Sequence, residues 1–97
     1  MNKLQIFFKA IEKWGAKSQY EMAQEEATEL ALAIRKHIRN NNHKSFTDLA
    51  GEIADVNIMI EQIYLMNPTI EKEAAKIYKQ KLERLERRVN NDNFEGK

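Results

Sequence analysis

The chain has 97 residues and 11.4 kDa, and its 16 Lys and Arg nearly balance 15 Asp and Glu, for a formal net charge of +1. This length predicts one domain over residues 1–97, and the tail at about 90–97 is expected to be frayed. The core of so short a chain is small, so we expect oligomerisation to complete the fold. The absence of Cys excludes a disulfide framework, a thiolate zinc site and a cysteine nucleophile. No run of about eighteen apolar residues and no signal-peptide pattern occur, so we expect a cytoplasmic protein without a membrane partner.

Hydrophobic periodicity predicts an all-α protein, a bundle of about four helices. Three Gly and one Pro are too few for the many turns of a sandwich or barrel. The first helix is expected at 3–13, where Gly15 favours a C-terminal turn. Ser18 and Glu21 have the spacing of a capping box, so a second helix is expected from Ser18 to about residue 40. Its expected apolar face consists of Tyr20, Ala23, Ala27, Leu30, Ala31, Ile34 and Ile38.

The second half of the chain predicts two further helices. The third is expected from a cap at Ser45 to about Met66, because Pro68 disfavours helix in the residue before it. Its expected apolar face consists of Leu49, Ile53, Val56, Ile60 and Ile63. Thr69 is expected to cap a fourth helix that ends near Val89.

Acidic residues are concentrated in two segments that contain no basic residue. Residues 18–34 contain four acids and residues 45–71 contain five, whereas Lys and Arg gather in 35–44 and 72–88. Surface helices usually place opposite charges four residues apart, so this separation indicates a role beyond solvation.

Paired carboxylates within these segments predict a metal site. Glu26 and Glu29 on the second helix, like Glu52 and Asp55 on the third, have the i,i+3 spacing that puts two side chains on one helical face. Two antiparallel helices can bring both pairs together, and carboxylates gathered at one spot repel unless they are protonated or bind a cation. Hard divalent cations prefer oxygen ligands, so Mg²⁺ or Mn²⁺ is expected. The alternative is a cluster of Glu on a solvated helix surface.

The same segments resemble a family signature. Residues 25–29, with the sequence EEATE, and residues 52–55, with the sequence EIAD, are similar to the EExxE…ExxD pattern of MazG-like all-α nucleotide pyrophosphohydrolases of the single-domain bacterial and phage type. The flanks, WGAKSQ at 14–19 and YKQKLERLER at 78–87, agree with such proteins, and the resemblance covers about residues 10–89.

This resemblance implies a MazG-like helical bundle that hydrolyses (d)NTP to (d)NMP and pyrophosphate and so removes unwanted nucleotides from the pool. The Mg²⁺ ligands that it implies are Glu26, Glu29, Glu52 and Asp55. It implies that Glu25, beside Glu26, serves catalysis by helping with a second metal or by positioning the attacking water. Members form dimers or tetramers, so a homo-oligomer is expected. Asn57 departs from the pattern, because many close relatives have an acid two residues after the Asp.

Three further residues are candidate substrate contacts. Trp14 could stack on a nucleobase, or it could cap the core at a helix junction. Gln19 could hydrogen-bond the base or the sugar, or it could be a polar residue of a first helical turn. Lys44 lies near the loop between the two acidic helices, where it could contact phosphates or only solvate a helix end.

The other basic residues near this loop are Arg35, Lys36 and Arg39. They could contact phosphates, or they could be cations placed favourably at a helix C-terminus. His37 and His43 are six residues apart and make a poor metal pair, so both are expected to be exposed to solvent.

The alternative function is a non-catalytic helical interaction module that binds nucleic acid through the fourth helix. Residues 76–88 contain six basic and two acidic residues, which favours such a surface. The i,i+4 pairs of Glu83 with Lys79 and Arg87, and an apolar stripe that continues to Val89, instead favour a bundle helix with a basic outer face. A nucleic-acid partner is therefore not expected.

Overall fold

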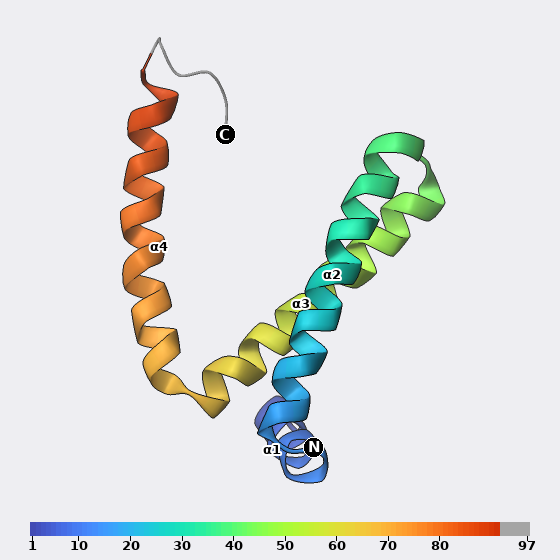
Figure 1. Cartoon of the computed structure of the whole chain (residues 1–97), viewed down its shortest axis with the longest axis vertical. Helices are drawn as coiled ribbons and strands as arrows, with labels where there is room; N and C mark the ends of the chain where they lie inside the picture. The colour runs from blue at the N-terminus through green and yellow to red at the C-terminus, as the bar shows by residue number, and fades with distance from the viewer. Residues whose placement is uncertain (92–97) are drawn as a thin grey trace. The chain divides into compact units, whose positions relative to one another are not determined.

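The computed structural model describes residues 1–91, which form four helices and no strand (Figure 1). The helices are α1 (Lys3–Trp14), α2 (Ala16–Asn40), α3 (His43–Met66) and α4 (Pro68–Val89). The all-α prediction and the number of helices are confirmed. The predicted frayed tail lies, from residue 92 onward, outside the described residues. No helix within residues 1–91 combines the length and the apolar character needed to cross a bilayer.

The residues that break the helices act largely as predicted. Gly15 ends α1 with a φ of 87°, a conformation that costs Gly little, and its N–H donates to the carbonyl of Ile11 at 2.8 Å. α2 resumes directly at Ala16, so the predicted capping box at Ser18 is wrong, because a single Gly suffices to redirect the chain. Pro68 is the first residue of α4, and α3 ends two residues before it.

Asn residues, rather than the predicted hydroxyl residues, cap α3 and α4. Oδ1 of Asn42 accepts from the N–H of Ser45 at 2.8 Å, and Oγ of Ser45 accepts in return from the N–H of Asn42 at 3.1 Å. Ser45 is therefore the third residue of α3 and not its cap. Oδ1 of Asn67 accepts from the N–H of Ile70 at 3.3 Å, which corrects the predicted cap at Thr69. Asn caps are as effective as Ser or Thr caps, and these Asn residues come earlier in the chain.

α2 and α3 form an antiparallel hairpin, joined by Asn41 and Asn42 (Figure 1). The residues that this hairpin buries or half-buries alternate in steps of three and four, as in a coiled-coil seam. On α2 they are Gln19, Ala23, Glu26, Leu30, Ala33 and His37. On α3 they include Ser45, Leu49, Glu52, Val56, Met59 and Ile63. We call these two rows the seam.

The seam coincides only in part with the predicted apolar faces, which share with it Ala23 and Leu30 of α2 and Leu49, Val56 and Ile63 of α3. The apolar residues just outside the seam are 39 to 64% exposed, on α2 and on α3 alike. They lie roughly a quarter turn from the seam on one side of both helices. We call this surface the apolar side, and it consists of Tyr20, Ile34, Ile38, Phe46, Ile53 and Ile60. Among the described residues only three hydrophobic side chains are buried: Phe7, Ala33 and Met59.

The chain divides into two compact units, Met1–Met66 and Asn67–Lys97. In the first, α1 packs on α2, and Nζ of Lys3 forms an exposed ion pair with Glu61 of α3 at 2.6 Å. In the second, α4 buries none of its residues although it is strongly amphipathic. The single domain expected from the length stays a prediction.

Candidate metal centre

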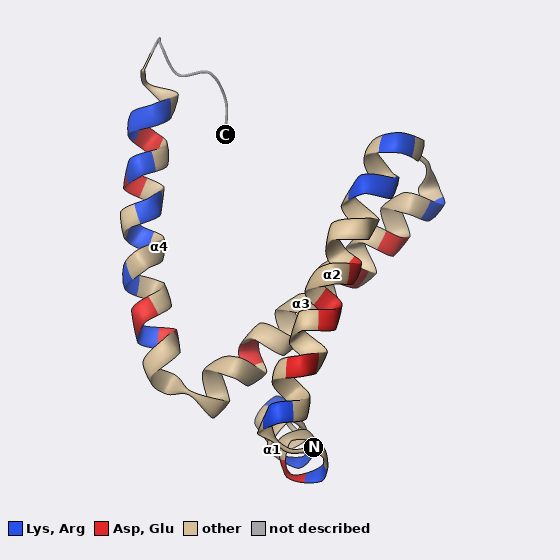
Figure 2. Cartoon of the chain, viewed as in Figure 1, with Lys and Arg blue, Asp and Glu red and all other residues tan. Residues whose placement is uncertain are grey.

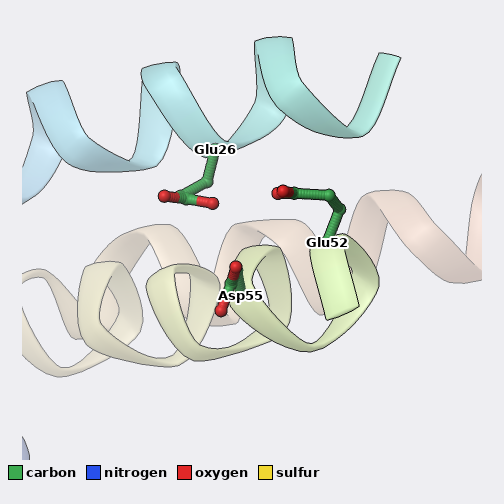
Figure 3. Close-up of side chains that lie close together, drawn as sticks. All are labelled: Glu26, Glu52 and Asp55. Atoms are coloured by element: carbon green, nitrogen blue, oxygen red, sulfur yellow. The ribbon is translucent and has the colours of Figure 1, made fainter. Parts of the chain in front are cut away.

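Three of the predicted metal ligands meet between α2 and α3. Glu26 extends from α2 towards α3, and Glu52 and Asp55 project from α3 into the same space (Figure 3). One carboxylate oxygen from each of the three lies within 4.8 Å of the others. We call Glu26, Glu52 and Asp55 the carboxylate triad. The i,i+3 spacing in α3 and the seam positions of Glu26 and Glu52 produce this arrangement.

Burial and mutual repulsion make the triad electrostatically unfavourable without a cation. Partial burial of Glu26 is the first cause that raises the pKa of its carboxyl above the ordinary value. Hydrogen bonding to Glu52 and the negative charges of Asp55 and Glu52 raise this pKa further. Nothing in residues 1–91 donates a hydrogen bond to Oε2 of Glu52, which is buried. Such an oxygen is costly to bury, and a hard cation would satisfy it.

Basic side chains do not neutralise the triad. The ion pairs found within residues 1–66 join Lys3 to Glu61 and Lys44 to Asp48, and neither involves a triad residue. Figure 2 shows acidic positions along the middle of α2 and α3 and basic positions near the loop between them. The donor set consists of carboxylate oxygens alone, which suits Mg²⁺ or Mn²⁺ better than a metal that prefers His or Cys.

The other two predicted acids lie beside the triad and not in it. Glu29 is exposed and lines the same groove as Glu52 and Asp55, one turn from Glu26. Glu25 is also exposed, and it lines a hollow of about 310 Å³ on α2 with Glu26 and Glu29. Asp55 is exposed, yet its carboxylate lies close to those of Glu26 and Glu52.

The predicted substrate contacts have different surroundings. Trp14 is 58% exposed, and Nζ of Lys13 lies 5.3 Å from its ring centroid. Gln19 is only 4% exposed within the seam, so its side chain is part of the packing. Nζ of Lys44 pairs with Asp48 at 2.8 Å.

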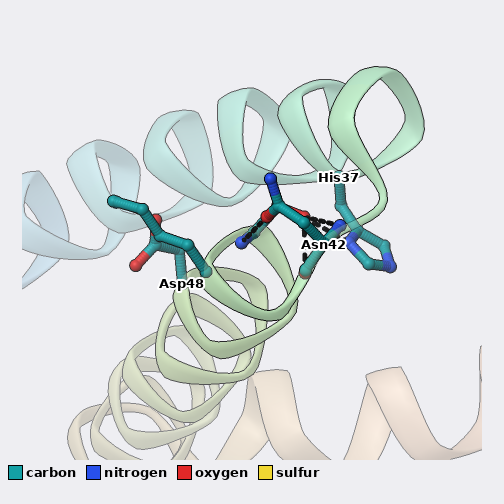
Figure 4. Close-up of polar contacts among 5 residues, drawn as sticks. His37, Asn42 and Asp48 are labelled. Carbon is teal, nitrogen blue, oxygen red and sulfur yellow. Dashed lines mark hydrogen bonds and ion pairs between the residues drawn. The ribbon is translucent and has the colours of Figure 1, made fainter.

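His37 corrects the expectation of two exposed histidines. It is half-buried, and its Nδ1 lies 2.8 Å from Oγ of the buried Ser45, in a network that includes Asn42 (Figure 4). Its ring also meets Phe46 edge-on at 6.4 Å. This network connects α2 to the start of α3 and stabilises the loop end of the hairpin. His43 is exposed as expected.

A groove of about 470 Å³ runs between α2 and α3 from the triad to the loop. It lies on the face of the hairpin opposite the apolar side, because its lining residues fall on the other flank of the seam in both helices. The lining residues are Glu29, Leu32, Ala33, Lys36, Asn40, Asn42, Lys44, Ser45, Thr47, Asp48, Gly51, Glu52 and Asp55. One end is therefore acidic, and the other end has two Lys, Asp48 and several neutral polar groups.

Comparisons with models of protein families, with curated proteins and with solved structures find no match for this chain. The resemblance to MazG-like enzymes thus remains a prediction from the two motifs. The case for a function depends on the chemistry of the triad and the groove.

Proposed function

We propose that the protein is a divalent-cation-dependent nucleotide pyrophosphohydrolase of the MazG-like type, which cleaves (d)NTP to (d)NMP and pyrophosphate. The observation that carries this proposal is the carboxylate triad: three acids from two helices converge, and one of their oxygens is buried without a donor. These acids belong to the EEATE and EIAD segments whose pattern resembles the family signature.

Glu26, Glu52 and Asp55 would hold Mg²⁺, or Mn²⁺ in its place, and Glu29 offers a further oxygen one turn away. A bound divalent cation neutralises the negative charge of the triphosphate and polarises the phosphoryl group. Glu25 is exposed and lines a hollow with Glu26 and Glu29, so it would orient a water molecule there and accept its proton. The hairpin supplies the rigid positioning on which phosphoryl transfer largely depends.

We further propose that a second copy of the chain covers the apolar side of the hairpin. Its six large residues are spaced along both helices in steps that suit packing against another helical pair. Burying such a side chain contributes about 1.5–3 kcal/mol, which the sparse core of the single chain does not provide. The groove is on the opposite face, so this homo-oligomer leaves the triad accessible.

Product identification tests the activity. The purified protein is incubated with Mg²⁺ and each common NTP and dNTP, and monophosphate, pyrophosphate and orthophosphate are measured separately. The proposal expects monophosphate and pyrophosphate in equal amounts, a yield lost in Asp55→Asn and kept in Glu21→Gln, which removes an exposed acid outside the groove.

Two results would contradict the proposal. Diphosphate and orthophosphate would mean cleavage at the other phosphoanhydride bond. No hydrolysis of any nucleotide, combined with salt-dependent binding of DNA or RNA, would favour the interaction module that binds through α4.

A further inference from the structure

The end of the groove near the loop carries Lys side chains, whereas the triad end is acidic. Of the four Lys and Arg in residues 35–44, only Lys36 and Lys44 line the groove, and Arg35 and Arg39 do not. Lys44 is already paired with Asp48. Lys36 is exposed and forms no ion pair among the described residues, so its charge is available to a ligand.

The spacing between the two ends suits an extended anion. Lys36 lies seven residues after Glu29, two turns along the same face of α2, which corresponds to roughly 10 Å of helix. Lys44 lies eleven residues before Asp55, three turns along the same face of α3. A flexible Lys stem spans much of such a separation, so both ammonium groups can approach a chain of phosphates that begins at the triad.

Neutral polar groups and open space complete this end of the groove. Asn40, Asn42 and Thr47 line it, and they provide hydrogen-bonding groups without charge. Gly51 lies in the wall between the two ends, and a Cβ added there would meet nothing within 4 Å. The groove is thus open at Gly51.

We propose that Lys36, assisted by Lys44, binds the β- and γ-phosphates of a nucleoside triphosphate whose α-phosphate lies at the carboxylate triad. This inference rests on the proposed function and adds the orientation of the substrate and the residues that hold its β- and γ-phosphates. During hydrolysis the oxygen of water bonds to the α-phosphorus and its proton passes to Glu25. The bond to the α,β-bridging oxygen breaks, and pyrophosphate leaves with the electron pair next to Lys36.

The test compares Lys36→Gln with Arg35→Gln, which removes the same charge from the neighbouring residue outside the groove. Binding of inorganic tripolyphosphate with Mg²⁺ is measured by calorimetry, and KM is measured for the best nucleotide substrate. We expect Lys36→Gln to weaken tripolyphosphate binding and to raise KM by on the order of tenfold or more, because a charge-assisted hydrogen bond is lost. Arg35→Gln should change either quantity by less than about twofold, because the groups it affects are solvent-screened.

The outcomes separate this inference from the proposed hydrolase. Equal effects of the two substitutions, with normal hydrolysis by the wild type, would overturn the role of Lys36 and leave the hydrolase standing. Tripolyphosphate binding that depends on Lys36, without hydrolysis by the wild type, would support the phosphate site and overturn the hydrolase. Gln is a good helix former, and unchanged circular dichroism verifies that both variants fold.

Discussion

The two faces of the α2–α3 hairpin differ sharply in chemistry although the same two helices form both. One face carries the groove, with the triad at one end and Lys36 at the other, and the opposite face carries the large residues of the apolar side. The seam between them mixes apolar residues with polar ones and includes Glu26 and Glu52. This difference teaches that two acids can occupy the seam while large apolar residues beside it stay on the surface of the single chain.

The largest expected effect concerns the groove face alone. Glu52→Gln or Asp55→Asn should lower kcat/KM by about 100-fold or more, since removing a group that stabilises transition-state charge typically costs this much. Steady-state assays with the best nucleotide measure the effect. The matched control, Glu21→Gln, removes an exposed acid of α2 outside the groove and should retain wild-type kinetics. Retained activity in both triad variants would mean that the triad is not the site.

The next largest expected effect concerns self-association through the apolar side. Ile53→Lys should weaken self-association by about 100-fold, because a buried interface cannot accommodate an unpaired ammonium group without a large penalty. Light scattering after size-exclusion chromatography reports the mass. Leu32→Lys provides the comparison, because Leu32 is similarly exposed, at 49%, but lines the groove. If Leu32→Lys dissociated the oligomer and Ile53→Lys did not, the two faces would have been assigned the wrong way round.

A smaller effect links the triad to stability. Millimolar Mg²⁺ should raise the Tm of the wild type by a few degrees, since a ligand of the native state stabilises it. Glu26→Gln should have a higher Tm than the wild type without metal, because a neutral amide relieves desolvation and repulsion, and it should lose the Mg²⁺ response. Differential scanning calorimetry of both proteins, with Mg²⁺ and with a chelator, measures these differences in Tm. A Glu26→Gln variant that still responds fully to Mg²⁺ would place the cation elsewhere.

The raised pKa of Glu26 also sets the sign of a pH effect. The native state holds the Glu26 proton at pH values where the unfolded chain has released it. In the absence of metal, this carboxyl therefore contributes stability below its unfolded pKa that is lost as pH rises through the raised native value. Chelator-treated wild type should lose more stability across this window than Glu26→Gln does, as measured by urea unfolding at a series of pH values. Parallel curves for the two proteins would contradict this assignment.

The smallest effect lies in the wall of the groove. Gly51→Ala should stabilise the protein by about 0.5–1 kcal/mol, because Ala has the better helix propensity and its Cβ meets no other atom within 4 Å. Urea unfolding measures the gain. A loss of stability would mean that the groove closes in solution and that Gly51 is in contact with another part of the molecule.

The sequence predicts what depends on local chemistry. The breaks at Gly15 and Pro68 follow from backbone preferences of single residues, and the i,i+3 spacing of Glu52 and Asp55 correctly places their carboxylates close together. The caps were misassigned because Ser45 and Thr69 compete with Asn residues that come slightly earlier. Such competition depends on backbone geometry that composition does not reveal.

The face through which each helix pairs was only partly predicted from the sequence, because two of the seven expected apolar residues of α2 and three of the five of α3 lie in the seam. Periodicity identifies the most apolar face of α2, yet the hairpin pairs through a more polar face that includes Gln19 and Glu26. Both faces have helical spacing, so local pattern does not decide between them. For the same reason Lys36 could not be separated from Arg35 in the sequence, because only the position of the groove distinguishes these neighbouring cations.

The most direct test of the central claim, that α2 and α3 build a divalent-cation site, is a Mn²⁺ titration followed by electron paramagnetic resonance. The signal of free Mn²⁺ should fall as the wild-type protein is added, Mg²⁺ should restore it by competition, and Glu21→Gln should behave like the wild type. Glu52→Gln should leave the Mn²⁺ signal nearly as in buffer. Equal Mn²⁺ binding by the wild type and Glu52→Gln would contradict the claim.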